Sequence, residues 1–82
     1  PAPHAHNPEQ GVLRGERHRA LAAAVAALPP AQRQVVLLRE FAGMKYDDIA
    51  RITGTPRNTL LSHMHRALKT LRAALAPDHG PA

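Results

Sequence analysis

The sequence lacks cysteine and tryptophan, and it contains a single phenylalanine, Phe41, and a single tyrosine, Tyr46. Without cysteine the chain has neither a disulfide framework nor a thiolate metal site. So few aromatic residues argue against a β-barrel or β-sandwich and favour packed helices. No apolar run approaches the roughly 20 residues that a membrane span needs, and nothing resembles a signal peptide. We therefore expect a soluble, cytoplasmic domain.

The length of 82 residues allows one small domain. Both ends are rich in proline and glycine, and the chain begins with Pro rather than Met, which suggests a fragment of a longer protein. We expect residues 1–15 to form an interdomain linker or flexible N terminus and residues 16–76 to form the folded domain. Residues 77–82 are expected to be a flexible C terminus.

Positive charge is in excess, with 11 Lys and Arg against 6 Asp and Glu. Between Asp48 and Asp78 there is no acidic residue, whereas five basic residues accumulate there: Arg51, Arg57, Arg66, Lys69 and Arg72. A patch of one sign attracts polyanions such as nucleic acid. The alternative interpretation is an ordinary solvated helix face.

Apolar residues repeat with helical spacing in four stretches. The first has them at i, i+3, i+4 and i+7, namely Leu21, Ala24, Val25 and Leu28. Pro29 and Pro30 end this helix, and Pro30 opens the next one, where its missing N–H is tolerated. The second helix should stop near Gly43 and bury Val35, Leu38 and either Val36 or Leu37.

A third, short helix is predicted to end at Gly54, a typical left-handed C-terminal residue. Its first turn contains Asp47 and Asp48, which favour the positive end of the helix dipole. Its inner side should hold Tyr46, Ile49, Ala50 and Ile52. Thr55 is predicted to cap a fourth helix, with Pro56 at the first helical position.

The fourth helix has two distinct sides when its residues are placed 100° apart. Its apolar sector contains Leu60, Met64, Ala67, Leu71 and Leu75. The opposite side carries donors and cations suited to phosphates and base edges in a major groove: Asn58, Thr59, Ser62, Arg66 and Lys69. Two helices joined by a tight glycine turn, the second longer and basic, are typical of a helix-turn-helix.

These patterns predict an all-α fold, a compact four-helix domain with a C-terminal helix-turn-helix. Its core should contain Val35, Leu38, Ile49, Ile52, Leu60, Met64 and Leu71. Base-proximal contacts are expected from the N-terminal part of the fourth helix, at Arg57, Asn58, Thr59, Ser62, His63 and Arg66. Phosphate contacts are expected at Lys69, Arg51 and Lys45.

The stretch from Leu28 to Arg72 resembles region 4 of sigma-70-family factors, especially the extracytoplasmic-function (ECF) group. The shared residues stand in family order: Leu28-Pro29, Arg33, Leu38-Arg39-Glu40, Gly43, Tyr46, Ile49-Ala50, Gly54, Thr59, Ser62, His65-Arg66-Ala67 and Leu71-Arg72. The resemblance implies a domain that recognises the minus-35 promoter element and is linked to a region 2. It also implies docking on the flap of the RNA polymerase β subunit and control by an anti-sigma factor.

The chain departs from this family pattern at several positions. Cationic residues are common in relatives where this chain has Leu61, His63 and Leu68. Leu61 and Leu68 lie seven residues apart beside the apolar sector. They either pack against the first or second helix or form an exposed strip that binds a protein partner. Lys45 replaces a serine that would cap the third helix, and Asp47 with Asp48 should compensate in part.

Metal-binding and catalytic sites are not expected. His63 and His65 point about 200° apart on a helix and do not share one ion, and His4 and His6 lie in a segment expected to be flexible. We predict no enzymatic activity, cofactor, small-molecule substrate or membrane contact. Two alternatives to promoter recognition stay open: a sigma-like protein-interaction module that reads DNA weakly, and a LuxR-type response-regulator output domain.

Overall fold

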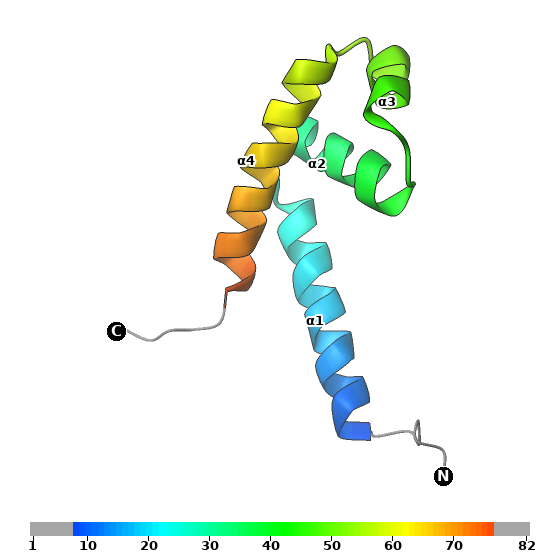
Figure 1. The fold of residues 1–82 in the computed structure, drawn as a ribbon. Coiled ribbons are helices and arrows are strands. Elements are labelled where there is room, and N and C mark those ends of the chain that lie inside the picture. The colour runs from blue at the N-terminus through cyan, green and yellow to red at the C-terminus, as the bar shows by residue number, and fades with distance from the viewer. Residues whose placement is uncertain (1–7, 77–82) are drawn as a thin grey trace.

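The computed structural model describes residues 8–76, with side chains from residue 11 onward. This part of the chain forms α1 (Pro8–Ala26), α2 (Pro30–Val36), a short π-helical segment η1 (Leu37–Phe41), α3 (Tyr46–Thr53) and α4 (Arg57–Leu75). It contains no strand, so the predicted all-α class is confirmed. In Figure 1, α2 passes behind α4 and continues into η1 to the right of α4, and α3 lies beside the start of α4.

Helix α1 begins earlier than the sequence predicted. Residues 8–15 are helical, which corrects the expectation that they belong to a flexible segment. Pro8 starts the helix, where a missing N–H is tolerated, and Gly11 and Gly15 lie inside it. The N-terminal half of α1 projects away from the other helices (Figure 1). Residues 1–7 and 77–82, also expected to be flexible, lie outside the described residues.

The core lies where α4 crosses the other helices. It contains Val25, Leu28, Val35, Val36, Ile49, Leu60, Met64, Ala67 and Leu71. Val35 and Ile49 are completely buried. Five of the seven predicted core residues are therefore confirmed, and Leu38 is partly buried against the same cluster.

Ile52 is the exception, because 59% of this residue is exposed. The inner position at the end of α3 belongs instead to Thr53, whose hydroxyl donates a 2.7 Å hydrogen bond to the carbonyl oxygen of Ile49. A threonine that satisfies its hydroxyl within its own helix can face the interior. Ile52 is then turned outward, and its assignment to the core was wrong.

Two further apolar residues lie outside the core. Leu75 is 40% exposed, because α1 and α4 diverge toward that end of the molecule (Figure 1). Leu37 is 42% exposed, and the buried member of its pair is Val36. The prediction that Leu75 faces the core is corrected accordingly.

The connections around α3 depend on two glycines. Gly43 and Gly54 have φ angles of 70° and 71°, in the left-handed region that glycine adopts without steric cost. The amide of Gly54 donates to the carbonyl oxygen of Ala50 at 2.9 Å and closes α3. Both predicted helix ends are thus confirmed.

The start of α4 differs by one residue from the prediction. Pro56, rather than Thr55, is the N-cap residue, and no side chain caps the helix. The carbonyl oxygen of Pro56 accepts hydrogen bonds from the amides of Thr59 and Leu60 at 3.0 and 3.1 Å. Thr55 has a different role, because its amide donates to the Thr53 hydroxyl oxygen at 3.2 Å.

Candidate nucleic-acid interface

Helix α4 presents a polar side chain row to solvent because its other side is held in the core. Leu60, Met64, Ala67 and Leu71 are buried. The residues on the opposite side are all exposed: Asn58, Thr59, Ser62, Arg66 and Lys69. We call these five the polar row. The predicted grouping of these side chains on one exposed face is therefore present, and their contact with DNA stays a prediction.

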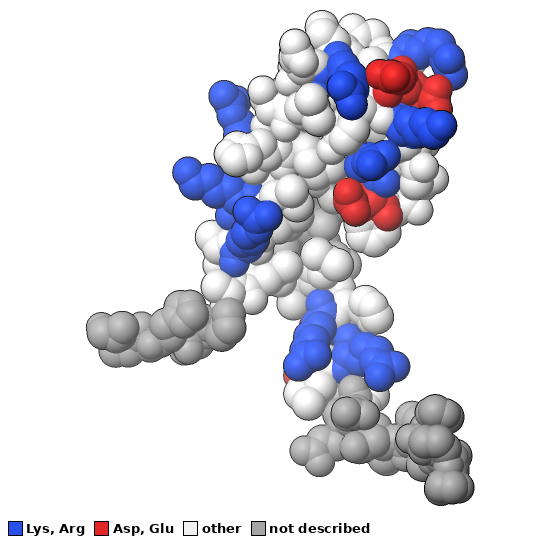
Figure 2. Space-filling view, viewed as in Figure 1, with Lys and Arg blue, Asp and Glu red and all other residues white. Residues whose placement is uncertain are grey.

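The electrostatics of α4 differ from those of the neighbouring elements. Helix α4 has no acidic residue, whereas α3 has Asp47 and Asp48 in its first turn. Figure 2 shows basic side chains without acidic neighbours along the side formed by α4, whereas most acidic side chains on that face lie over α3 and η1, next to basic ones. A surface with this asymmetry attracts a polyanion to α4.

The predicted phosphate contacts on the α3 side are also exposed. Arg51 pairs with Asp48 one turn earlier in α3, with 3.0 Å between Nη2 and Oδ1. Lys45 precedes α3 and, as predicted, makes no side-chain cap. Its carbonyl oxygen accepts hydrogen bonds from the amides of Asp48 and Ile49, both at 3.0 Å. Lys45 thus lies at the start of α3, and Arg51 lies in its last turn, ahead of the turn that leads to α4.

Two of the six predicted base-proximal side chains on α4, His63 and Arg57, are less available for contact than the other four. His63 is half-buried and lies at the margin of the polar row, so its predicted base contact is the least accessible of the six. Arg57 is exposed but engaged: its Nε lies 3.4 Å from Oδ1 of Asp47. Its Cζ lies 5.9 Å from the ring centroid of Tyr46.

Sequence reasoning missed this arrangement around Tyr46. Asp47 was assigned only a favourable interaction with the helix dipole, although its carboxylate reaches the first residue of the next helix. Arg39 approaches the same ring, with Cζ 4.8 Å from its centroid. The residues involved belong to three consecutive elements, η1, α3 and α4, so the periodicity within any one helix does not report their contact.

Leu61 and Leu68 lie at the edge of the core rather than in it. They are 37% and 36% exposed, and neither belongs to the core cluster. The two residues are therefore partly exposed and do not belong to the buried core. With Leu75 they form an apolar edge along α4, each seven residues from the next. Binding of a protein partner at this edge stays a prediction.

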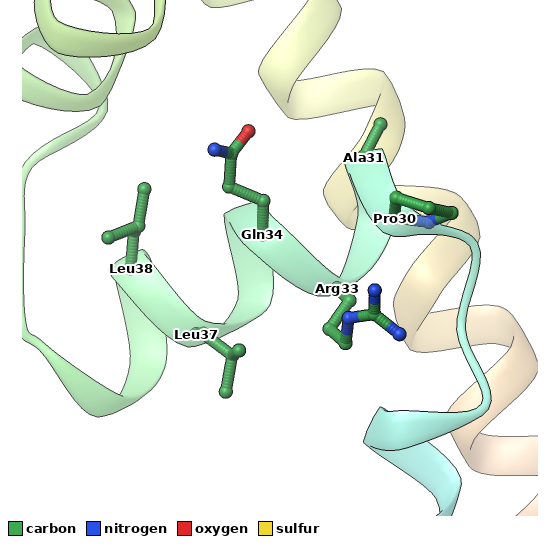
Figure 3. Close-up of a pocket in the computed structure, with 6 residues that line it drawn as sticks. All are labelled: Pro30, Ala31, Arg33, Gln34, Leu37 and Leu38. Carbon is green, nitrogen blue, oxygen red and sulfur yellow. The ribbon is translucent and has the colours of Figure 1, made fainter.

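An open hollow of about 470 Å³ lies on α2, away from the polar row, and sequence reasoning did not predict it. Figure 3 shows Gln34 and Leu38 projecting to one side of the helix and Arg33 and Leu37 to the other. The remaining lining residues are Pro30 and Ala31. Arg33 is fixed by a 3.0 Å hydrogen bond from Nη1 to the carbonyl oxygen of Ala26 at the end of α1.

Residues 8–76 bring no three His, Asp or Glu side chains together in a way that suits a metal ion. His4 and His6 lie outside the described residues. Over the same residues, no helix is both long enough and apolar enough to cross a bilayer.

Comparison with known proteins covers the four helices. A family model described as Sigma-70, region 4 matches residues 18–71. The chain is 35% identical over 71 residues to RNA polymerase sigma-H factor of Pseudomonas aeruginosa, covering 87% of this chain and 37% of that protein. It is 36% identical over 72 residues to ECF RNA polymerase sigma factor BldN of Streptomyces coelicolor, covering 88% and 27%.

A third relative is RNA polymerase sigma factor SigV of Bacillus subtilis, 36% identical over 55 residues, with 67% of this chain and 33% of that protein aligned. The chain thus spans between 27% and 37% of the length of these three curated relatives. The matched family region begins inside α1 and includes the whole of α2, α3 and the buried part of α4.

Proposed function

Because this chain belongs to the region 4 family of sigma-70 factors and is of the ECF type, we propose that it recognises the minus-35 element of a promoter. The polar row of α4 enters the major groove in this proposal. The base-proximal residues are Arg57, Asn58, Thr59, Ser62, His63 and Arg66. Lys69, Arg51 and Lys45 contact phosphates and set the register of the helix on the duplex.

The exposed polar row opposite a buried apolar row on α4 carries this proposal. Because Leu60, Met64 and Leu71 hold one side of α4 in the core, the helix cannot turn its polar row away from solvent without losing this packing. The N-terminal half of such a helix approaches base edges in helix-turn-helix proteins. Exposed amide, hydroxyl and guanidinium groups are the side chains that hydrogen-bond bases there.

The partners of the domain follow from the family and are part of the proposal. We propose that the domain works in the cytoplasm with RNA polymerase core, docks on the flap of the β subunit, and is joined by its N-terminal segment to a region 2. Control by an anti-sigma factor is supported by the apolar edge at Leu61 and Leu68, because exposed leucines in a row favour a protein partner. We propose no catalytic activity.

Fluorescence anisotropy tests the DNA-binding function directly. The domain is titrated with a duplex selected from a random pool and with a scrambled duplex, at two salt concentrations. Discrimination of a hundredfold or more, which is about 2.7 kcal/mol, supports promoter recognition. Equal affinity for both duplexes, lost together as salt rises, would show attraction to phosphates alone.

A second candidate function rests on the exposure of Leu61 and Leu68, where relatives often carry cations. The domain is then chiefly a sigma-like protein-interaction module that reads DNA weakly. Absence of discrimination in the titration favours this function. The LuxR-type alternative is set aside, because the chain belongs to the sigma-70 family.

A further inference from the structure

We propose that Asp47 and Tyr46 are positioning residues for Arg57, which they hold in one orientation at the head of α4 so that it contributes to sequence discrimination rather than to general attraction for DNA. This inference rests on the proposed promoter recognition. It concerns two residues of α3 that are not themselves required to contact a base.

The contacts bridge the beginnings of two helices. Tyr46 and Asp47 are the first two residues of α3, and Arg57 is the first residue of α4. The Arg57 guanidinium lies 3.4 Å from the Asp47 carboxylate through Nε and 5.9 Å from the Tyr46 ring centroid through Cζ. Because Nε is the atom engaged, the two terminal nitrogens of Arg57 stay available for a bidentate contact with a base or phosphate.

Tyr46 supplies the fixed side of this arrangement. It is partly buried against the core cluster, and the Arg39 Cζ lies 4.8 Å from its ring centroid. Arg39 is itself fixed, because its Nη1 donates a 2.9 Å hydrogen bond to the carbonyl oxygen of Met44. The ring is therefore held in place by the core, and its contact with Arg57 restrains the guanidinium relative to the core.

The other side of the arrangement, the ion pair between Arg57 and Asp47, is exposed. The side chains of Arg57 and Asp47 are 58% and 86% exposed, so their ion pair is weak and screened by salt. A weak restraint suits this role, because bound DNA competes for the guanidinium. Asp47 also offsets the charge of Arg57, which lowers its attraction to any phosphate irrespective of sequence.

Asp48 provides a matched comparison within the same turn of α3. It carries the same charge as Asp47, but its carboxylate pairs with Arg51 of its own helix at 3.0 Å. Arg51 is a proposed phosphate contact, which carries no sequence information. Removing either carboxylate changes the net charge equally, and only removal of Asp47 frees Arg57.

The experiment measures the affinities of Asp47→Asn and Asp48→Asn for the selected and scrambled duplexes. We expect Asp47→Asn to bind the scrambled duplex more tightly and to lower the discrimination ratio about two- to fivefold. Asp48→Asn should raise both affinities by similar factors and leave the ratio unchanged. Equal ratios for the two variants would overturn the inference while leaving promoter recognition intact.

A double-mutant cycle identifies the residue through which Asp47 acts. In an Arg57→Ala background, Asp47→Asn should have no further effect on the ratio. Tyr46→Phe keeps the ring and should retain the wild-type ratio, whereas Tyr46→Leu should lower it; thermal unfolding verifies that both fold. A ratio change by Asp47→Asn that persists without Arg57 contradicts positioning.

A measurement without DNA separates this inference from the proposed function. Relaxation of the Arg57 Nε–H signal in NMR should show an ordered side chain in the wild type and faster motion in Asp47→Asn, with no change in Asp48→Asn. Wild-type protein that fails to discriminate between the duplexes would overturn promoter recognition. An Arg57 that is equally mobile in all three proteins would overturn the positioning itself.

Discussion

The hydroxyl of Thr53, the last residue of α3, donates a hydrogen bond to the carbonyl oxygen of Ile49 at 2.7 Å. The same hydroxyl oxygen accepts a hydrogen bond from the amide of Thr55 at 3.2 Å. One side chain thus fixes both the end of α3 and the approach to α4. The angle between the two helices of the helix-turn-helix depends on this short connection.

Replacement of Thr53 by valine should destabilise the domain, because the shape is kept and both hydrogen bonds are lost. We expect a loss of about 1 kcal/mol in the free energy of unfolding, which lowers Tm by roughly 4–8 °C in a domain of this size. Thermal unfolding followed by circular dichroism measures this. Thr70→Val on the exposed side of α4 is the control and should change stability by less than about 0.5 kcal/mol.

Glycine-to-alanine substitution should have opposite effects at two positions. Gly54 has φ of 71° and no atom within 4 Å of an added Cβ, so Gly54→Ala should lose about 1–2 kcal/mol through backbone strain alone. Gly15 lies inside α1, and an added Cβ would meet only the Arg19 side chain at 3.6 Å. Gly15→Ala should gain about 0.5–1 kcal/mol. Urea unfolding compares the two, and a stabilised Gly54→Ala would refute the left-handed turn.

The burial of α3 can be tested with two isoleucines three residues apart. Ile49 is fully buried and Ile52 is 59% exposed. Ile49→Ala should cost about 2–5 kcal/mol, from lost transfer energy and the cavity that remains. Ile52→Ala should cost less than about 0.5 kcal/mol. Similar urea midpoints for the two variants would contradict the orientation of α3 described above.

The buried face of α4 was predictable because a long helix repeats its pattern several times. Leu60, Met64 and Leu71 share one sector at 100° per residue, and all are buried. Helix α3 is too short for this kind of evidence. Over 8 residues, the choice between Ile52 and Thr53 as the inward residue depends on a local hydrogen bond, which apolar periodicity does not report.

Other features depend on relationships that no sequence pattern contains. Residues 11–20 of α1 are exposed at nearly every position, and their sequence does not show the apolar stripe by which an amphipathic helix is recognised. The contact between Asp47 and Arg57 depends on how the turn places one helix against the next. The polar row was predictable as a set, whereas the restraint on Arg57 required the structure.

Restoring a cation at Leu61 should strengthen the attraction of α4 for DNA if this face meets phosphates. Leu61 is 37% exposed and outside the core cluster, so Leu61→Lys should change the free energy of unfolding by less than about 1 kcal/mol. Each added phosphate contact steepens the dependence of log affinity on log salt by about 0.9. Leu13→Lys, at a 45% exposed position of α1, adds the same charge away from α4 and should leave that slope unchanged. Equal slopes for the two variants would mean that DNA responds to net charge rather than to this face, and that the apolar edge at Leu61 is better explained by a protein partner.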